Sequence, residues 1–492
     1  MNDVRNARGI APSSRSALAG PMPDAPFSKE IPDFKALSAR WEELRRRLAP
    51  NRAGIWAHST HAVNKVQQGW KLHLSATILT AGQLLERCGE TLRKSGYPFK
   101  MAATLTEIQK LNTGRYYGRS QVGKVITVYV PDPADARLLA EKLHREIRSL
   151  ACPEIPSDRR YQPNSNVFYR YGSYVNRKLL KDGKMVPAYR DPDGRPVHDK
   201  RTRTTAVPEW TEDPFGTTAA VSKTSSKTSP GKAATPEQVR YRAVSAIQWR
   251  GDGGIFRALD MNARPPRPCI MKEGLRHGNI SCDGIDGFRS VQIEANALTI
   301  LRANNVRVPR VHDLFYQGGN SYLVQDLIDG KTLAELVDSE RLSARKKTEI
   351  ARQICDIVSG IHSAGWTWRD IKLSNFLYDG CHVWAIDLEF AMPIRSRKLR
   401  SLRGTRGHFR EVPDPMTGKQ ALMIDRYALG VTLQRLFGGA SERSSRYSKR
   451  LPAVPKSSGP NVARIIKALR DEQPERRPSA GQALECLVQS KP

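Results

Sequence analysis

Four polar residues between positions 370 and 387 have the types and the spacing that phosphoryl transfer requires. Asp370, Lys372 and Asn375 lie in one short stretch, and Asp387 follows within Ala-Ile-Asp-Leu-Glu. One aspartate can accept the proton of an acceptor hydroxyl, the lysine can neutralise the moving phosphate, and the asparagine with the second aspartate can hold Mg²⁺. We therefore expect ATP and Mg²⁺ as cofactors, catalytic roles for Asp370 and Lys372, and metal binding by Asn375 and Asp387.

The overall composition limits what surrounds this site. The chain has 492 residues, and 80 Lys and Arg against 49 Asp and Glu give it a formal net charge of +31. Such a charge belongs either to a generally basic surface or to one that meets an anion, such as phosphate, an acidic peptide, an acidic membrane or nucleic acid. The seven cysteines form no Cys-x-x-Cys pair, and no apolar run approaches the ~18 residues needed to span a bilayer. We expect a cytoplasmic protein with reduced thiols and no membrane contact.

The distribution of residue types predicts two domains of the α+β class. Residues 1–30 are rich in Pro, Arg and Ser, and residues 212–240 are rich in Ser, Thr, Lys and Pro. We expect a disordered N-terminal segment and a flexible linker there, because neither stretch has much to bury. The intervening segments, 31–211 and 241–492, combine helical periodicity with β-rich runs, and each is long enough for its own core.

Several residues upstream of position 370 are suited to binding the nucleotide. Gly251, Gly253 and Gly254 stand where a glycine-rich loop would bring backbone amides to the phosphates, although their spacing departs from Gly-x-Gly-x-x-Gly. Lys272 ends a predicted buried strand, and Glu294 lies in a predicted helix over 290–303. Alone, these two residues would be a strand-end lysine and a solvated glutamate. The downstream block favours an ion pair that aligns the lysine on the phosphates.

From about Tyr241 onward, these blocks occur in the order found in protein kinases, and the chain resembles that family. The resemblance implies a two-lobed fold with Lys272 and Glu294 beside the nucleotide and Asp370 as the base. Two departures alter the packing: Trp368 replaces the usual histidine, and Asp-Leu-Glu at 387–389 replaces Asp-Phe-Gly. We expect an atypical active kinase. The alternative is a pseudokinase, which the four polar residues disfavour.

A second group of residues suited to chemistry lies in the N-terminal segment, and all its members are basic. They are Lys71, His73, Lys100, Arg119, Lys124 and Arg170. Lys71 and His73 share one face of a predicted strand over 70–74, since side chains alternate along a strand. By itself such a pair is more often the polar face of a sheet than an active site, and the other members of the group favour a site.

Together, the two groups resemble class III and class IV lanthipeptide synthetases, whose lyase domain is related to the phosphothreonine lyases of bacterial type III effectors. The resemblance covers residues from about 55 to 490. It implies β-elimination of phosphate from phosphoserine or phosphothreonine, with Lys100 as the base and His73 as the acid. Lys71, Arg119 and Arg170 would surround the phosphate, with Lys124 a weaker candidate. To act as a base, Lys100 must be neutral, which burial and neighbouring cations can achieve.

We therefore expect an enzyme that phosphorylates Ser or Thr in a peptide or protein and then eliminates the phosphate to leave a dehydroamino acid. Synthetases of this family continue into a cyclase domain, which needs zinc in class IV, and this chain stops at Pro492 with no Cys-His set for zinc. We expect a dehydratase that lacks a cyclase and allow for a separate cyclase as partner. The alternative is a Ser/Thr protein kinase whose basic N-terminal module binds phosphoprotein or nucleic acid, the latter being the less expected ligand. A third hypothesis is a small-molecule phosphotransferase.

Overall fold

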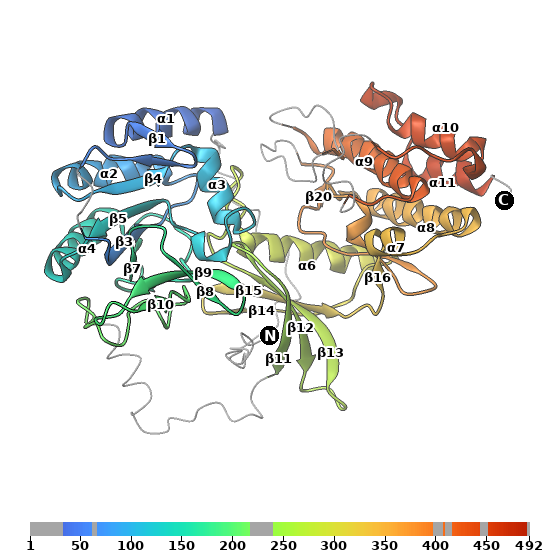
Figure 1. The fold of residues 1–492 in the computed structure, drawn as a ribbon. Helices are drawn as coiled ribbons and strands as arrows, with labels where there is room; N and C mark the ends of the chain where they lie inside the picture. Colours follow the sequence, from blue (N-terminus) through green and yellow to red (C-terminus); the bar gives the residue numbers. More distant parts are fainter. Residues whose placement is uncertain are drawn as a thin grey trace.

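Two units, each with its own hydrophobic core, make up the part of the chain for which there is a structural description (Figure 1). The computed structural model describes residues 33–61, 66–216, 240–396, 407–408, 416–442 and 451–489. The predicted N-terminal segment 1–30 and positions 217–239 of the predicted linker lie outside the described residues. The prediction of two α+β domains is confirmed, and the boundaries 31–211 and 241–492 stay predictions.

The first unit is built on a seven-stranded antiparallel sheet. In sheet order, its strands are Asn51–Ala53 (β1), Trp56–His58 (β2), Phe99–Ala102 (β4), Ile126–Val130 (β5), Gln68–Leu74 (β3), Val167–Ser173 (β7) and Arg159–Arg160 (β6). Alternation along β3 places Trp70, Leu72 and Leu74 on one face, where all three are buried. The other face carries Lys71 and His73. The sheet therefore has an apolar face that is part of the core and a polar face that is available for chemistry.

Four helices cover the apolar face of this sheet. They are Phe34–Leu48 (α1), Ala81–Lys94 (α2), Leu105–Thr113 (α3) and Pro133–Ile147 (α4). Helix α4 begins within Pro-Asp-Pro because Asp132 accepts a hydrogen bond from the amide of Asp135 and Pro133 occupies the first turn. Leu139 and Leu143 then face the sheet. The helix ends at Ile147, which is also buried in this core.

A smaller antiparallel sheet extends the first unit beyond β7. Its strands are Lys178–Lys181 (β8), Lys184–Arg190 (β9) and Pro196–His198 (β10). Tyr189 of β9 packs edge-on against Tyr171 of β7, with ring centroids 6.1 Å apart. This contact holds the small sheet, and the segment 199–206 that follows it, beside the polar face of the main sheet.

The second unit begins with a five-stranded antiparallel sheet. In sheet order, its strands are Tyr241–Trp249 (β11), Gly253–Asp260 (β12), Arg267–Gly274 (β13), Asn320–Asp326 (β15) and Val311–Gln317 (β14). Helix Gly287–Ala303 (α6) packs on this sheet and is capped by Asp286, which accepts a hydrogen bond from the amide of Arg289. The predicted helix over 290–303 therefore starts one turn earlier than expected, at a capping aspartate.

A mainly helical lobe follows. Its helices are Leu333–Ser339 (α7), Ala344–Ser363 (α8), Gly418–Gly438 (α9), Pro460–Leu469 (α10) and Ala480–Val488 (α11). Short strand pairs lie among them: Lys331–Thr332 (β16), Trp366–Thr367 (β17), Phe376–Tyr378 (β18), Val383–Ala385 (β19) and Met392–Pro393 (β20). Figure 1 shows this lobe, coloured orange to red, on the side of α6 away from the first unit. No helix in the described ranges is long and apolar enough to cross a membrane.

Candidate active sites

Helix α9 fixes the loop between β17 and β18 through the side chain of Asp425. Both carboxylate oxygens of Asp425 accept backbone hydrogen bonds, one from the amide of Trp368 and one from that of Arg369, each at 2.7 Å. Arg369 has a φ of +69°, a left-handed conformation that non-glycine residues seldom adopt. Because such backbone conformations persist only where neighbours hold them, Asp425 keeps the loop in one shape and directs the next residue, Asp370, into the site.

The predicted catalytic residues of this loop lie together. The ammonium of Lys372 is 2.5 Å from Oδ2 of Asp370, and the amide nitrogen of Asn375 donates to the same oxygen at 3.0 Å. Asn375 also donates to the backbone carbonyl of Asp370 at 2.9 Å. The carboxylate that would accept a proton is therefore held by two neighbours, one of which, Lys372, has the charge that a transferred phosphate needs.

The predicted ion pair on the nucleotide side is also formed. The Lys272 ammonium lies 2.7 and 2.9 Å from the two carboxylate oxygens of Glu294 and 3.2 Å from Oδ1 of Asp387. Burial lowers the pKa of Lys272, but the two carboxylates outweigh it and raise that pKa overall. The amide of Leu388 donates to Glu294 at 3.0 Å. Lys272 therefore stays charged, and α6 is locked to the segment that carries Asp387.

Asp387 and Asn375 suit a magnesium ion by the chemistry of their side chains. Carboxylate and amide oxygens are hard ligands that Mg²⁺ prefers, together with phosphate oxygens. Burial raises the pKa of Asp387, yet Lys272 and Lys372 hold it below its usual value overall, so the carboxylate stays ionised. Strands β18 and β19, which lie between Asn375 and Asp387 in the chain, pair with each other and bring the two residues together. The amide of Ile386 donates to the carbonyl of Asn375 at 2.9 Å.

The two departures from the usual kinase pattern, Trp368 and Asp-Leu-Glu at 387–389, change the surroundings of Asp387. The indole N–H of Trp368 donates to the carbonyl of Asp387 at 3.1 Å, and its ring meets that of Phe376 edge-on at 4.9 Å. Tryptophan therefore supplies a donor from the position where histidine is usual. Glu389 lies close to Asp387: burial, Asp387 and Asp252 raise the pKa of Glu389 well above the usual value.

The three predicted loop glycines are packed against protein backbone or side chains. A Cβ atom at Gly251 would lie 1.8 Å from the carbonyl oxygen of Asn112, and one at Gly253 would lie 1.8 Å from that of Glu273. At Gly254 it would lie 2.5 Å from the ring of Phe256. Backbone neighbours require glycine at Gly251 and Gly253, whatever the loop binds, whereas at Gly254 the neighbour is a side chain that can move.

In the first unit, the strand register brings four of the six predicted basic residues onto one face. Strand pairing aligns Lys100 of β4 with Thr127 of β5, and Thr127 with His73 of β3. Two positions along, Lys71 of β3 pairs with Arg170 of β7. Since adjacent strands are about 4.8 Å apart, Lys100 and His73 stand about 10 Å apart on the same face. Thr127 of β5 lies between them.

Asp158 connects the cations of this face. Its Oδ2 is 2.5 Å from Nδ1 of His73, and its Oδ1 is 3.0 Å from the ammonium of Lys124 and 3.9 Å from Arg170. The aspartate is fully buried. Burial raises the pKa of Asp158, but Lys124 and His73 outweigh it and hold that pKa well below the usual range. A permanent carboxylate on Nδ1 leaves Nε2 of His73 to face the site.

The lysines of this face have lowered pKa values. Burial and the neighbouring Arg170 and Lys124 lower the pKa of Lys71 to about 7. Burial, Lys124 and Arg201 lower that of Lys100 to about 8, and burial lowers that of Lys124 to about 8 although Asp158 opposes the change. Burial likewise lowers the pKa of His73 to about 3. A substantial fraction of Lys100 is therefore neutral near physiological pH, as a general base must be.

Arg170 presents one unsatisfied nitrogen to this group. Its Nη2 donates to Asp199 and its Nε donates to the carbonyl of Tyr171 at 3.3 Å. Its Nη1 is buried and has no hydrogen-bond partner among the described residues. Buried donors are nearly always paired in folded proteins. A buried guanidinium N–H that makes no hydrogen bond within the described ranges, and whose ion pair with Asp158 is as long as 3.9 Å, is thus what a site for an anionic ligand would contain.

Of the six predicted basic residues, Arg119 is the one that the structure does not bring to this face of the sheet. It begins the short helix Arg119–Gln121 (η1), and its guanidinium carbon lies 3.6 Å from the ring centroid of Trp249, which belongs to the second unit. Lys124, in contrast, lies among the other basic residues, with its ammonium 3.0 Å from Asp158, although the sequence made it a weaker candidate.

Three residues near this face escaped sequence analysis as members of the site. Thr127 of β5 lies between Lys100 of β4 and His73 of β3. The alternation of side chains along residues 124–130 could have indicated the face of the sheet on which it lies. Asp199 and Arg201 follow the small sheet, and Nε of Arg201 is 3.5 Å from Asp199. No local pattern marks those two, since only the docking of β9 on β7 brings them here.

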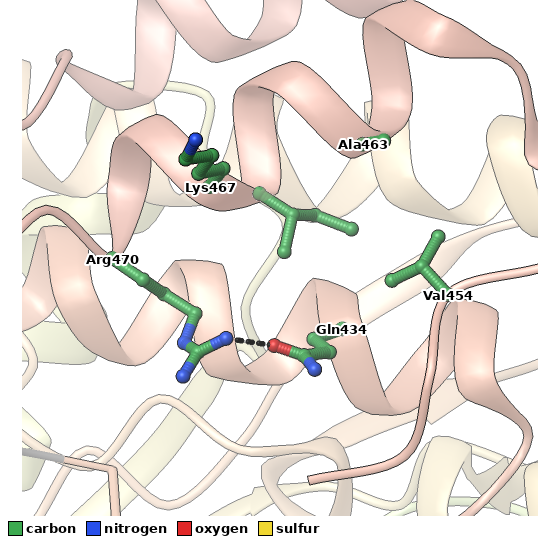
Figure 2. A pocket seen from close by; sticks show the side chains of 6 residues that line it. Gln434, Val454, Ala463, Lys467 and Arg470 are labelled. Carbon is green, nitrogen blue, oxygen red and sulfur yellow. Dashed lines mark hydrogen bonds between the residues drawn. The ribbon is translucent and has the colours of Figure 1, made fainter.

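A hollow elsewhere in the second unit has no evident connection with either group. Figure 2 shows this space of about 270 Å³ between α9 and α10, where Arg470 donates to Gln434. The side chains that line it are Gln434, Val454, Ala463, Ile466, Lys467 and Arg470. Among these there is no carboxylate, nucleophile or metal ligand, and we assign no role to it.

Comparison with known proteins agrees with this division. Residues 37–227 match the family described as "RamC, N-terminal domain", and residues 277–487 match "Protein kinase domain". The kinase match begins after Lys272, so Lys272 and the three loop glycines lie outside it, whereas Glu294, Asp370 and Asp387 lie within it.

Relatives fall into two kinds. "Probable SapB synthase" of Streptomyces coelicolor is 28% identical over 378 residues, 74% of this chain and 39% of that protein. "Serine/threonine-protein kinase D" of Synechocystis is 26% identical over 206 residues, 39% of this chain and 40% of the kinase. The chain thus spans about two fifths of the length of each. These findings confirm the resemblance drawn from the sequence: the chain combines a RamC N-terminal domain with a protein kinase domain.

Proposed function

We propose that the protein phosphorylates Ser or Thr side chains of a peptide with ATP and Mg²⁺ and then eliminates the phosphate. The observation that carries the proposal is the row of Lys100, His73 and Lys71 beside the orphaned Nη1 of Arg170. A polar sheet face without function would be solvated, whereas these basic side chains are largely buried, and burying such polar groups would cost stability unless they serve a ligand. The relative named as a SapB synthase supports a peptide substrate.

The first reaction uses the second unit. Asp370 accepts the proton of the acceptor hydroxyl while the hydroxyl oxygen bonds to the γ-phosphorus of ATP, and ADP leaves. Lys272 holds the α and β phosphates, and Lys372 neutralises the transferred group. Asn375 and Asp387 would hold Mg²⁺, which when bound offsets the negative charge of the phosphates.

The second reaction uses the first unit. Neutral Lys100 takes the proton from Cα, the electron pair forms the Cα–Cβ double bond, and the Cβ–O bond to phosphate breaks. His73 protonates the departing oxygen. Its imidazolium is disfavoured in the ligand-free site, but the dianionic phosphate and the Asp158 carboxylate would stabilise it. Lys71, Lys124 and Arg170 balance the phosphate charge. The products are inorganic phosphate and dehydroalanine or dehydrobutyrine.

The test supplies a synthetic phosphoserine peptide to the full-length protein and follows inorganic phosphate and peptide mass. Wild-type protein should release phosphate and leave the dehydrated peptide. Lys100→Ala should bind the peptide but release phosphate at least about 100-fold more slowly, because a general base contributes about 100- to 10,000-fold. The matched control is Lys178→Ala, an exposed lysine of β8, which should behave as wild type.

A kinase with a phosphoprotein-binding module is the second candidate, and the same cation row favours it, because binding needs no proton transfer. In that case wild-type protein would bind the phosphopeptide and return it unchanged. ATP-dependent phosphorylation of an unmodified peptide without any loss of water would point the same way.

A further inference from the structure

The two units touch at the loop that would cover the nucleotide. The amide of Gly251, in the turn between β11 and β12, donates to the carbonyl of Thr113 at the end of α3, at 3.0 Å. A Cβ atom at Gly251 would lie 1.8 Å from the carbonyl of the neighbouring Asn112. Figure 1 shows α3, in cyan, beside the strands of the second unit. The first unit thus packs directly on the backbone of this turn.

A second contact lies on the same turn. The guanidinium of Arg119 stacks on Trp249, the last residue of β11, at 3.6 Å from the ring centroid. Glu273, next to Lys272, lies close enough to raise the pKa of Arg119, although burial lowers that pKa overall. A cation over a tryptophan ring contributes about 0.5–2 kcal/mol. Arg119 is thus bound to the strand that leads into the turn.

The turn leads directly into the strand beside Lys272. Strand β12 begins at Gly253 and pairs with β13, so that Gly254 lies opposite Glu273 and Ile255 opposite Lys272. The carbonyl of Asp252 also accepts a hydrogen bond from the amide of Leu275 at 2.8 Å. The turn 250–252 therefore lies between the first unit and the position that the phosphates of a nucleotide would occupy.

We propose that Asn112, Thr113 and Arg119 are positioning residues for phosphoryl transfer: the lyase-like unit holds the nucleotide-binding turn of the kinase in place. A glycine-rich turn is otherwise mobile, and ordering it costs free energy when the nucleotide binds. Contacts already made by the first unit reduce that cost. The proposal rests only on nucleotide binding by the kinase half of the proposed function, and it gives Arg119 a role other than the phosphate contact expected from sequence.

Calorimetric titration of the full-length protein with MgATP tests this. Arg119→Ala and Trp249→Leu should each weaken ATP binding by about twofold to thirtyfold, the range that loss of one cation–π contact allows. The double variant should be no weaker than the single ones, because both remove the same contact. Trp249→Phe keeps an aromatic ring and should bind ATP nearly as wild type does.

Two controls separate this role from others. Arg115→Ala removes an exposed arginine of the same loop and should leave ATP affinity unchanged. Phosphate release from a synthetic phosphopeptide should be the same in Arg119→Ala and wild type. An unchanged ATP affinity in Arg119→Ala and Trp249→Leu would overturn the proposal, as would a loss of phosphate release confined to Arg119→Ala. Failure of wild-type protein to release phosphate would count against the lyase activity alone, since ATP affinity is measured independently.

Discussion

Asp158 is the residue on which the cations of the first unit depend. It contacts His73 at 2.5 Å and Lys124 at 3.0 Å, and all three side chains are buried. We expect Asp158→Asn to lower the free energy of unfolding by about 3–5 kcal/mol, because it leaves a buried ammonium without its counter-charge. Denaturant unfolding would measure the loss.

The double variant Asp158→Asn/Lys124→Met separates stability from chemistry. It removes both charges and should recover much of the lost stability. Phosphate release should stay low, since His73 no longer has a carboxylate to orient Nδ1 and stabilise its charged form. Recovery of both properties in the double variant would show that Asp158 serves only to balance Lys124.

The pH dependence of phosphate release should report the protonation state of the Lys100 amine. Burial, Lys124 and Arg201 lower its pKa to about 8, and only the neutral amine can take a proton. We expect kcat/KM for a phosphopeptide to rise with pH and to level off above about pH 8. Arg201→Gln removes one of the cations and should shift this inflection to higher pH, because the ammonium is then less disfavoured. Arg195→Gln, at an exposed position directly before β10, should leave the inflection in place. A profile that falls between pH 6 and 8 would exclude Lys100 as the base.

At the scale of elements, the strands show what a sequence can and cannot predict. The alternation of Trp70 to Leu74 indicated which side chains share a face, and the structure agrees. The sequence did not show that Lys100 would align with His73, because two strands adjacent in the sheet, β5 and β3, are far apart in the chain. Asp158 lies in a loop whose only local signal was its charge.

Helix α9 makes the catalytic loop rigid through Asp425. The helix begins at Gly418 after the capping residue Thr417, and Asp425 lies within it. We expect Asp425→Ala to reduce ATP-dependent phosphorylation strongly, since two buried amides lose their acceptor at a cost of about 1–3 kcal/mol each and Arg369 loses its support. Release of phosphate from a phosphopeptide should be unaffected, because it takes place in the other unit. Equal loss of both activities would indicate general unfolding, which a melting curve would detect.

At the scale of the whole molecule, the division into two units has two consequences. Residues at the contact between the units could not be recognised from the sequence, and variants of one unit should complement variants of the other. The contact around Gly251 joins the two units at the nucleotide turn, which sequence analysis placed beside the phosphates without any sign of a neighbour. Arg119 was assigned to the phosphate for the same reason: its partner Trp249 lies beyond the predicted linker. Residues at such an interface carry no periodic pattern of their own, so only the assembled structure distinguishes them from residues of the site.

On the proposed function, Asp370→Ala protein should be unable to phosphorylate a peptide but should keep the row of Lys100 and His73, whereas Lys100→Ala protein should have the opposite defect. We expect each variant alone to give no dehydrated product from an unmodified peptide and ATP. A mixture of the two should give dehydrated peptide, because the phosphopeptide made by one molecule can diffuse to the other. Its yield should rise with total protein concentration, unlike that of wild type, which can pass the peptide between its own sites. Mass spectrometry of the peptide at several concentrations measures this, with a mixture of Asp370→Ala and Lys100→Ala/Asp370→Ala as the control without kinase. If the mixture accumulates phosphopeptide and never dehydrates it, the two activities do not share a released intermediate.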